Sequence, residues 1–87
     1  MSDPLNNSIL DTIKKLLGLA SDYEVFDADV MIHINAAFLT LNDLGVGPAQ
    51  PFVVNDKEQT WAQFFGGVDQ QYESVKAYIY LKTRLAF

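Results

Sequence analysis

The sequence predicts a mainly α protein: a small bundle of three principal helices, with a short fourth helix and a short extended or β segment. Three stretches repeat apolar residues at the helical period, and residues typical of helix ends bound most of them. The chain has 87 residues, 49% hydrophobic and 20% charged, which is the composition of one folded domain over residues 1–87. Such a chain can bury one modest core.

The first predicted helix covers about residues 8–17. Ser8 followed by Asp11 resembles a capping box, and Gly18 is typical of the position just after a helix. Residues 18–26 form a connector. The second helix runs from Ala28 to Leu44, with Asp27 as its predicted N-cap. Its apolar residues cover more than one face, which is typical of a helix that is central to a bundle or covered by a partner.

The sequence of the second half of the chain predicts three elements of secondary structure. Residues 52–54 (FVV) combine an aromatic residue with two β-branched ones and predict an isolated strand or one arm of a hairpin. Thr60 is the predicted N-cap of a short helix over residues 61–65, which ends at Gly66. The last helix begins near Asp69 and reaches the final residue. The predicted core consists of Leu10, Ile13, Leu17, Ile34, Phe38, Leu41, Trp61, Phe64, Val75, Tyr78 and Ile79.

Composition argues against several classes of function. The chain has no cysteine and a single histidine, so we expect no cofactor, no metal site and no enzymatic activity. His33 with Asp29 one turn earlier could tune an imidazole, but the helix offers no nucleophile beside it. The net charge of −5 argues against binding to nucleic-acid phosphates, and no apolar run is long enough to span a membrane. An intracellular location is therefore expected.

Charge is segregated along the chain. Residues 16–56 contain six acidic residues and no basic one, whereas residues 76–87 contain three basic residues and no acid. This polarity suits a head-to-tail contact between copies, although an ordinary solvated surface would also explain it. The candidate subunit or partner interface consists of Asp22, Tyr23, Glu24, Lys76, Tyr80, Lys82, Arg84 and Phe87. The apolar, uncapped end at Phe87 predicts that the natural chain continues or that this end docks on another subunit; simple fraying is the alternative.

The order of the motifs resembles a known family. LLG at residues 16–18 precedes IHINAAF at 32–38 and LNDLGVGP at 41–48; FVV at 52–54, TW at 60–61 and VKAYIYLK at 75–82 follow. Together they resemble the head–tail connector proteins of long-tailed bacteriophages, also called head-completion or adaptor proteins. The similarity covers nearly the whole chain. These are packing motifs and not catalytic ones.

The resemblance implies a structural role in the virion, at the head–tail junction, after assembly in the host cytoplasm. Such proteins form a ring, usually twelve-fold, beneath the portal protein; the ring extends the DNA channel and receives the next connector or a tail protein. Packaged DNA would pass without specific binding. Family members often continue with a proline break and a further helix toward the portal, which this sequence lacks. The alternative function is a small acidic regulatory module that binds another protein.

Overall fold

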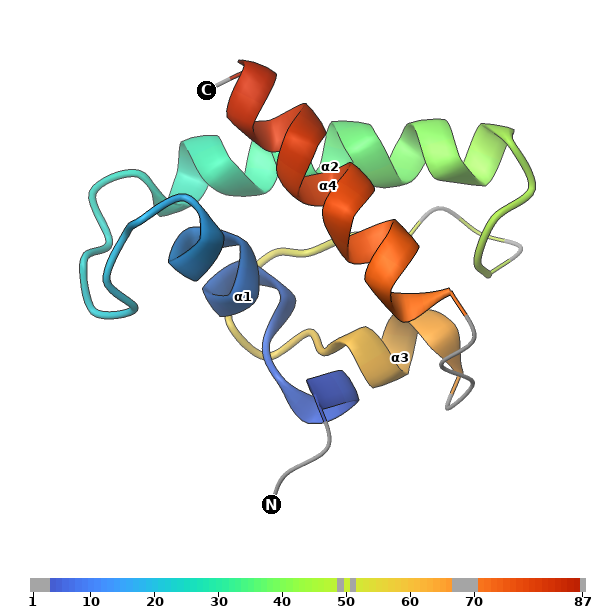
Figure 1. Cartoon of the computed structure of the whole chain (residues 1–87), viewed down its shortest axis with the longest axis horizontal. Coiled ribbons are helices and arrows are strands. Elements are labelled where there is room, and N and C mark those ends of the chain that lie inside the picture. Colours follow the sequence, from blue (N-terminus) through green and yellow to red (C-terminus); the bar gives the residue numbers. More distant parts are fainter. Residues whose placement is uncertain (1–3, 49, 51, 67–70, 87) are drawn as a thin grey trace.

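The described part of the chain forms four helices and one short 3₁₀ turn. The computed structural model describes residues 4–48, 50, 52–66 and 71–86. The elements are η1 (Pro4–Asn6), α1 (Ile9–Leu16), α2 (Asp27–Asp43), α3 (Trp61–Phe65) and α4 (Tyr72–Ala86). The most extensive packing is between α2 and α4, and α1 packs against both. Figure 1 shows α4 crossing in front of α2, with α1 and α3 below them. The predicted mainly α bundle is confirmed.

Local capping explains where the short helices begin and end. The Ser8 hydroxyl accepts a hydrogen bond from the Asp11 backbone N–H, and Gly18 follows α1 with a φ of 84°. Thr60 and Gln63 form a reciprocal capping box at the start of α3. Antiparallel bridging between Ser8 and Thr60 brings the starts of α1 and α3 together. The ends that sequence reasoning assigned to these two helices are therefore confirmed to within one residue.

The core surrounds the indole of Trp61, which is fully buried. Its Nε1 donates to the hydroxyl of Thr12 at 3.1 Å, and its ring lies edge-on to Tyr72. Phe38 of α2 lies 4.7 Å from Phe64 of α3, measured between ring centroids. Nine of the predicted core residues are buried: Leu10, Ile13, Ile34, Phe38, Leu41, Trp61, Phe64, Val75 and Ile79. Leu17 and Tyr78 are only partly buried and pack against the edge of this core.

Two expectations about local structure were wrong. Asp27 is not an N-cap: it is the first residue of α2, Phe26 occupies the cap position, and the Asp27 carboxylate turns inward. Residues 52–54 form no strand, because both backbone groups of Val54 are bonded to a side chain instead. The Val54 N–H donates to Asn35 Oδ1 at 2.7 Å, and its carbonyl accepts from Asn35 Nδ2 at 2.9 Å. The predicted ends of the last helix, at Asp69 and Phe87, lie outside the described residues.

Candidate subunit interface

The connector between α1 and α2 is held by a buried lysine. The Lys14 side chain is fully buried, and its ammonium group lies 2.7 Å from Asp27 Oδ1. The same group donates to the carbonyl of Tyr23 at 2.7 Å and to that of Ser21 at 3.0 Å. A buried ammonium is tolerated only where its charge is paired and its donors are satisfied, and here three acceptors meet it. Lys14 therefore fixes the path of residues 17–26.

A second lysine holds the connector from the other side. Lys57 Nζ donates to the Ser21 carbonyl at 2.6 Å and lies 3.8 Å from a carboxylate oxygen of Glu24. Lys57 belongs to a turn whose backbone N–H groups at Asn55 and Asp56 donate to the side chain of Gln59. Two separate parts of the chain thus position the same loop. Sequence reasoning missed this arrangement, because it requires contacts across 36 residues.

The connector displays an acidic and apolar surface. Asp22, Tyr23 and Glu24 are all exposed, as predicted for the candidate interface. The Tyr23 ring lies edge-on to the Phe26 ring at 5.9 Å, and Val25 beside them is 70% exposed. We call these five residues, 22–26, the acidic loop surface. Large apolar side chains on a loop that is held rigidly in place are typical of protein–protein contacts.

The predicted interface residues of α4 differ in their availability. Lys76 is engaged within its own helix, with Glu73 at 3.2 Å and the Tyr72 ring centroid at 4.8 Å. Tyr80 is partly buried against the core. Lys82 is exposed and lies over the Tyr78 ring at 5.8 Å, and Arg84 is exposed with no ion-pair partner among the described residues. Phe87 lies outside the described residues.

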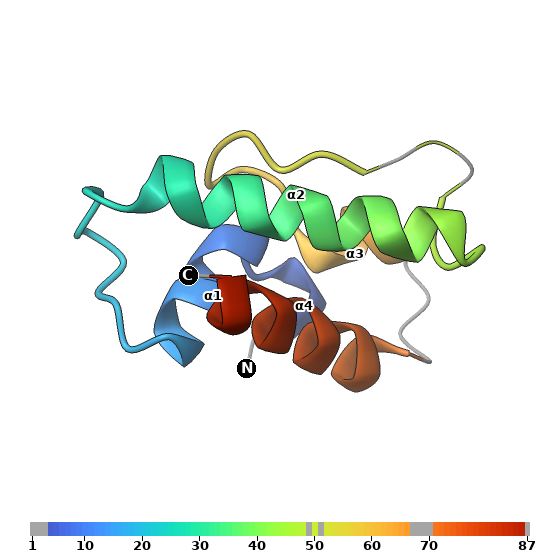
Figure 2. The same cartoon turned by 90° about the horizontal axis from the view of Figure 1, so that it is seen from above.

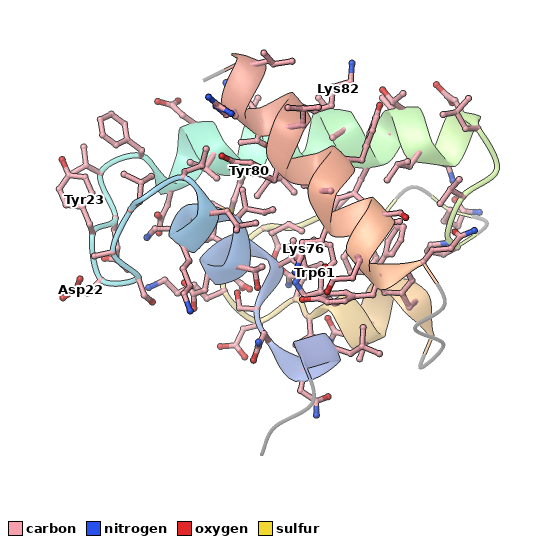
Figure 3. All side chains as sticks on the ribbon, viewed as in Figure 1. Asp22, Tyr23, Trp61, Lys76, Tyr80 and Lys82 are labelled. Carbon is pink, nitrogen blue, oxygen red and sulfur yellow. The ribbon has the colours of Figure 1, made fainter. Side chains whose placement is uncertain are left out.

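The candidate residues form two surfaces and not one site. Figure 3 shows Asp22 and Tyr23 on the α1–α2 connector at one end of the molecule, while Lys82 projects past the edge of α2. Lys76 lies in the middle of the same view, near Trp61. The available basic residues, Lys82 and Arg84, lie on the last two turns of α4 beside exposed Leu81 and Leu85. The acidic surface and the basic one are therefore formed by different elements of the same chain.

The described residues contain no cluster of three His, Asp or Glu side chains that could hold a metal ion. None of the described helices is both long and apolar enough to cross a membrane. His33 is partly buried on α2. The exposed charges and apolar side chains of the two surfaces are suited to recognition of another protein.

Comparison with known proteins identifies the family. The family described as "Phage connector protein" matches residues 9–87, which include α1 to α4 and both surfaces. No curated protein matches the chain, and no solved structure does. The match covers far more than half of the sequence. The chain therefore belongs to the phage connector protein family, whose members are structural components of the phage head–tail region.

Proposed function

We propose that this chain is the subunit of a ring that docks beneath the portal after DNA packaging. The ring extends the DNA channel and provides the surface on which the next connector or a tail protein assembles. Its partners are further copies of itself, twelve on a twelve-fold portal, together with the portal protein. Packaged DNA passes through the channel without specific binding. Membership of the phage connector family supports this role.

One observation carries the proposal: surfaces of opposite charge occupy separate parts of one chain, and each includes exposed apolar side chains. Asp22 and Glu24 lie beside Val25 on one surface, and Lys82 and Arg84 lie beside Leu85 on the other. A contact between two different surfaces of identical subunits is heterologous, and repeating it closes into a ring when the rotation allows. Opposite charges would also direct the encounter and suppress contacts between like surfaces.

The acidic balance also suits a channel that DNA must traverse. Six acids and no basic residue lie within residues 16–56. A wall of this charge repels phosphates, so DNA would slide past without binding. Substituting Asp22 by lysine would slow DNA ejection if this loop faces the channel. Unchanged ejection kinetics in that variant would remove the acidic loop from the channel wall.

Assembly on the portal tests the ring directly. The purified chain is mixed with portal particles, and the copies bound per portal are counted by native mass spectrometry. We expect a fixed integer number of copies and a weakening of the contact as salt rises, because screening reduces exposed ion pairs. A variant with Lys82 and Arg84 both changed to glutamate should bind in smaller numbers, whereas Lys15→Glu on the exposed face of α1 should not. A chain that stays monomeric with and without portal would overturn the ring and favour a regulatory binding module.

A further inference from the structure

The outward face of α2 is apolar, and none of the described residues covers it. Ile32 is 63% exposed and Leu39 is 51% exposed, with the exposed Ala36 between them. These positions recur at spacings of four and three residues, so they form one line along the helix. The buried residues of α2, such as Ile34 and Phe38, lie on the opposite side. We call residues 32, 36 and 39, with Asp29 and Asp43 at the two ends of the line, the α2 outer face.

A second uncovered line runs along α4. Leu81 is 50% exposed and Leu85 is 77% exposed, and Ala77 continues the line one turn earlier. Arg84 is exposed on the same side of the helix. The buried residues Val75, Ile79 and Thr83 point the other way. We call residues 77, 81, 84 and 85 the α4 outer face.

The two outer faces belong to different helices, and each lies opposite the residues that its own helix buries. Figure 2 shows α2 and α4 at different levels, with the segment that leads from α2 to α3 running along the side of α2 that is away from α4. Each face could therefore contact a neighbouring molecule without obstructing the other. This is the arrangement that a chain of identical subunits needs.

Charge determines which pairs of faces fit. Asp29 and Asp43 each lie seven residues from Ala36, or about 10.5 Å along the helix axis. An antiparallel pair of α2 outer faces centred on Ala36 would place these carboxylates against each other. Like charges in contact oppose such a symmetric α2 dimer. An α2 outer face set against an α4 outer face places Arg84 near an aspartate instead.

We propose that the α2 outer face binds the α4 outer face of a second copy, as two helices packed through interdigitating Ile32, Leu39, Leu81 and Leu85. The small side chain of Ala36, set opposite Leu81, would let the helices approach closely. The inference deepens the proposed ring, on which it rests, by assigning the contact to two helix faces. Within the acidic part of the chain it assigns this contact to Asp29 and Asp43 of α2, and it leaves the acidic loop surface to face the channel or a different partner.

The absence of cysteine allows a precise test. We would prepare full-length Ala36→Cys and Leu81→Cys, mix them in equal amounts with portal particles, and oxidise them gently. A disulfide requires the two Cα atoms to lie within about 7 Å, so it reports direct contact of the faces. Asp22→Cys mixed with Leu81→Cys is the matched control for the acidic loop surface. Intact mass spectrometry separates the mixed disulfide from each homodimer, and native mass spectrometry of the reduced samples counts the copies assembled.

We expect the mixed Ala36→Cys and Leu81→Cys disulfide to exceed each homodimer and the Asp22→Cys control by at least tenfold. Assembled rings whose disulfides form only through Asp22→Cys would overturn the α2 assignment and leave the ring function standing. A predominance of Ala36→Cys homodimers would overturn it in favour of a two-fold contact. If the reduced samples contain monomers alone and no disulfide forms, both the contact and the ring are wrong.

Discussion

Replacing Lys14 by methionine tests the most unusual interaction in the protein. The ammonium group is fully buried and meets Asp27 Oδ1 and two backbone carbonyls within 3.0 Å. Methionine is of similar length and fills the same volume, so the change removes the charge and the donors with little loss of packing. The Asp27 carboxylate, whose side chain is only 15% exposed, would then lack its cation.

The structure sets the expected size of the effect. Removing one partner of a buried ion pair costs about 3–5 kcal/mol, mostly because the other charge stays buried. The Ser21 carbonyl keeps its hydrogen bond from Lys57, and water can reach the carbonyl of Tyr23 because this residue is exposed. The lower end, about 3 kcal/mol, is therefore expected. A domain of this length has a free energy of unfolding of about 4–13 kcal/mol, so the variant should fold but be clearly weakened.

Urea unfolding followed by circular dichroism measures the loss. Lys15→Met is the matched control, since Lys15 is the exposed neighbour on the same helix and its replacement should stay within about 0.5 kcal/mol of the parent. Lys14→Met combined with Asp27→Asn should cost less than the sum of the two single changes, because the double variant leaves no unpaired charge. A loss at Lys14 below about 1 kcal/mol, or one equal to that at Lys15, would refute the argument.

Three further changes probe the core and the loops. Trp61→Ala should cost about 3–5 kcal/mol in urea unfolding, because the indole is fully buried; a loss under about 1 kcal/mol would place it at the surface. Asn35→Leu leaves both backbone groups of Val54 without partners, so thermal unfolding should show a Tm lower by roughly 10 °C, and an unchanged Tm would contradict the bridge. Gly47→Ala should be costlier than Gly45→Ala by about 1–3 kcal/mol in urea unfolding. Both glycines have positive φ, but a Cβ at Gly47 would lie 2.5 Å from an aromatic ring of α3 while Gly45 faces open space, so equal losses would refute the clash.

Features encoded by neighbouring residues were the most predictable. Ser8 and Thr60 cap their helices through the backbone three residues later, and Gly18 and Gly66 end helices with positive φ. These interactions span a few residues, so a short stretch of sequence contains both partners. The apolar period likewise identified most of the core. Each of these predictions depends on one element at a time.

Features that join distant elements could not be predicted. Asn35 bonds a backbone 19 residues away, and this replaced the strand expected at residues 52–54. Lys14 lies beside the buried Ile13 on α1, and its partners lie 7 to 13 residues later in the sequence. The positions of these partners depend on how the connector folds back toward α1. Asp27 forms an ion pair with this lysine, although its position in the sequence suits a helix N-cap equally well. Tertiary contact decided each case.

The candidate interface was predictable in part. The exposure of residues 22–24 follows from their place in a polar connector, and the charge segregation is visible in the sequence. The pairing of Lys76 with Glu73 was also readable from its spacing of three residues, and it makes that lysine a weaker candidate. Ile32 and Leu39 lie outside the predicted core of α2, and the sequence already placed them on a second apolar face; the structure shows that this face is exposed.

The central claim, that this chain joins phage heads to tails, is tested most directly in the parent phage. An early stop codon is placed in the gene, and the lysate is imaged by negative-stain electron microscopy with and without the protein supplied in trans. We predict separate heads and tails, with heads that lose DNA, and joined particles when the protein is restored. Joined, infectious particles in the absence of the protein would contradict the account.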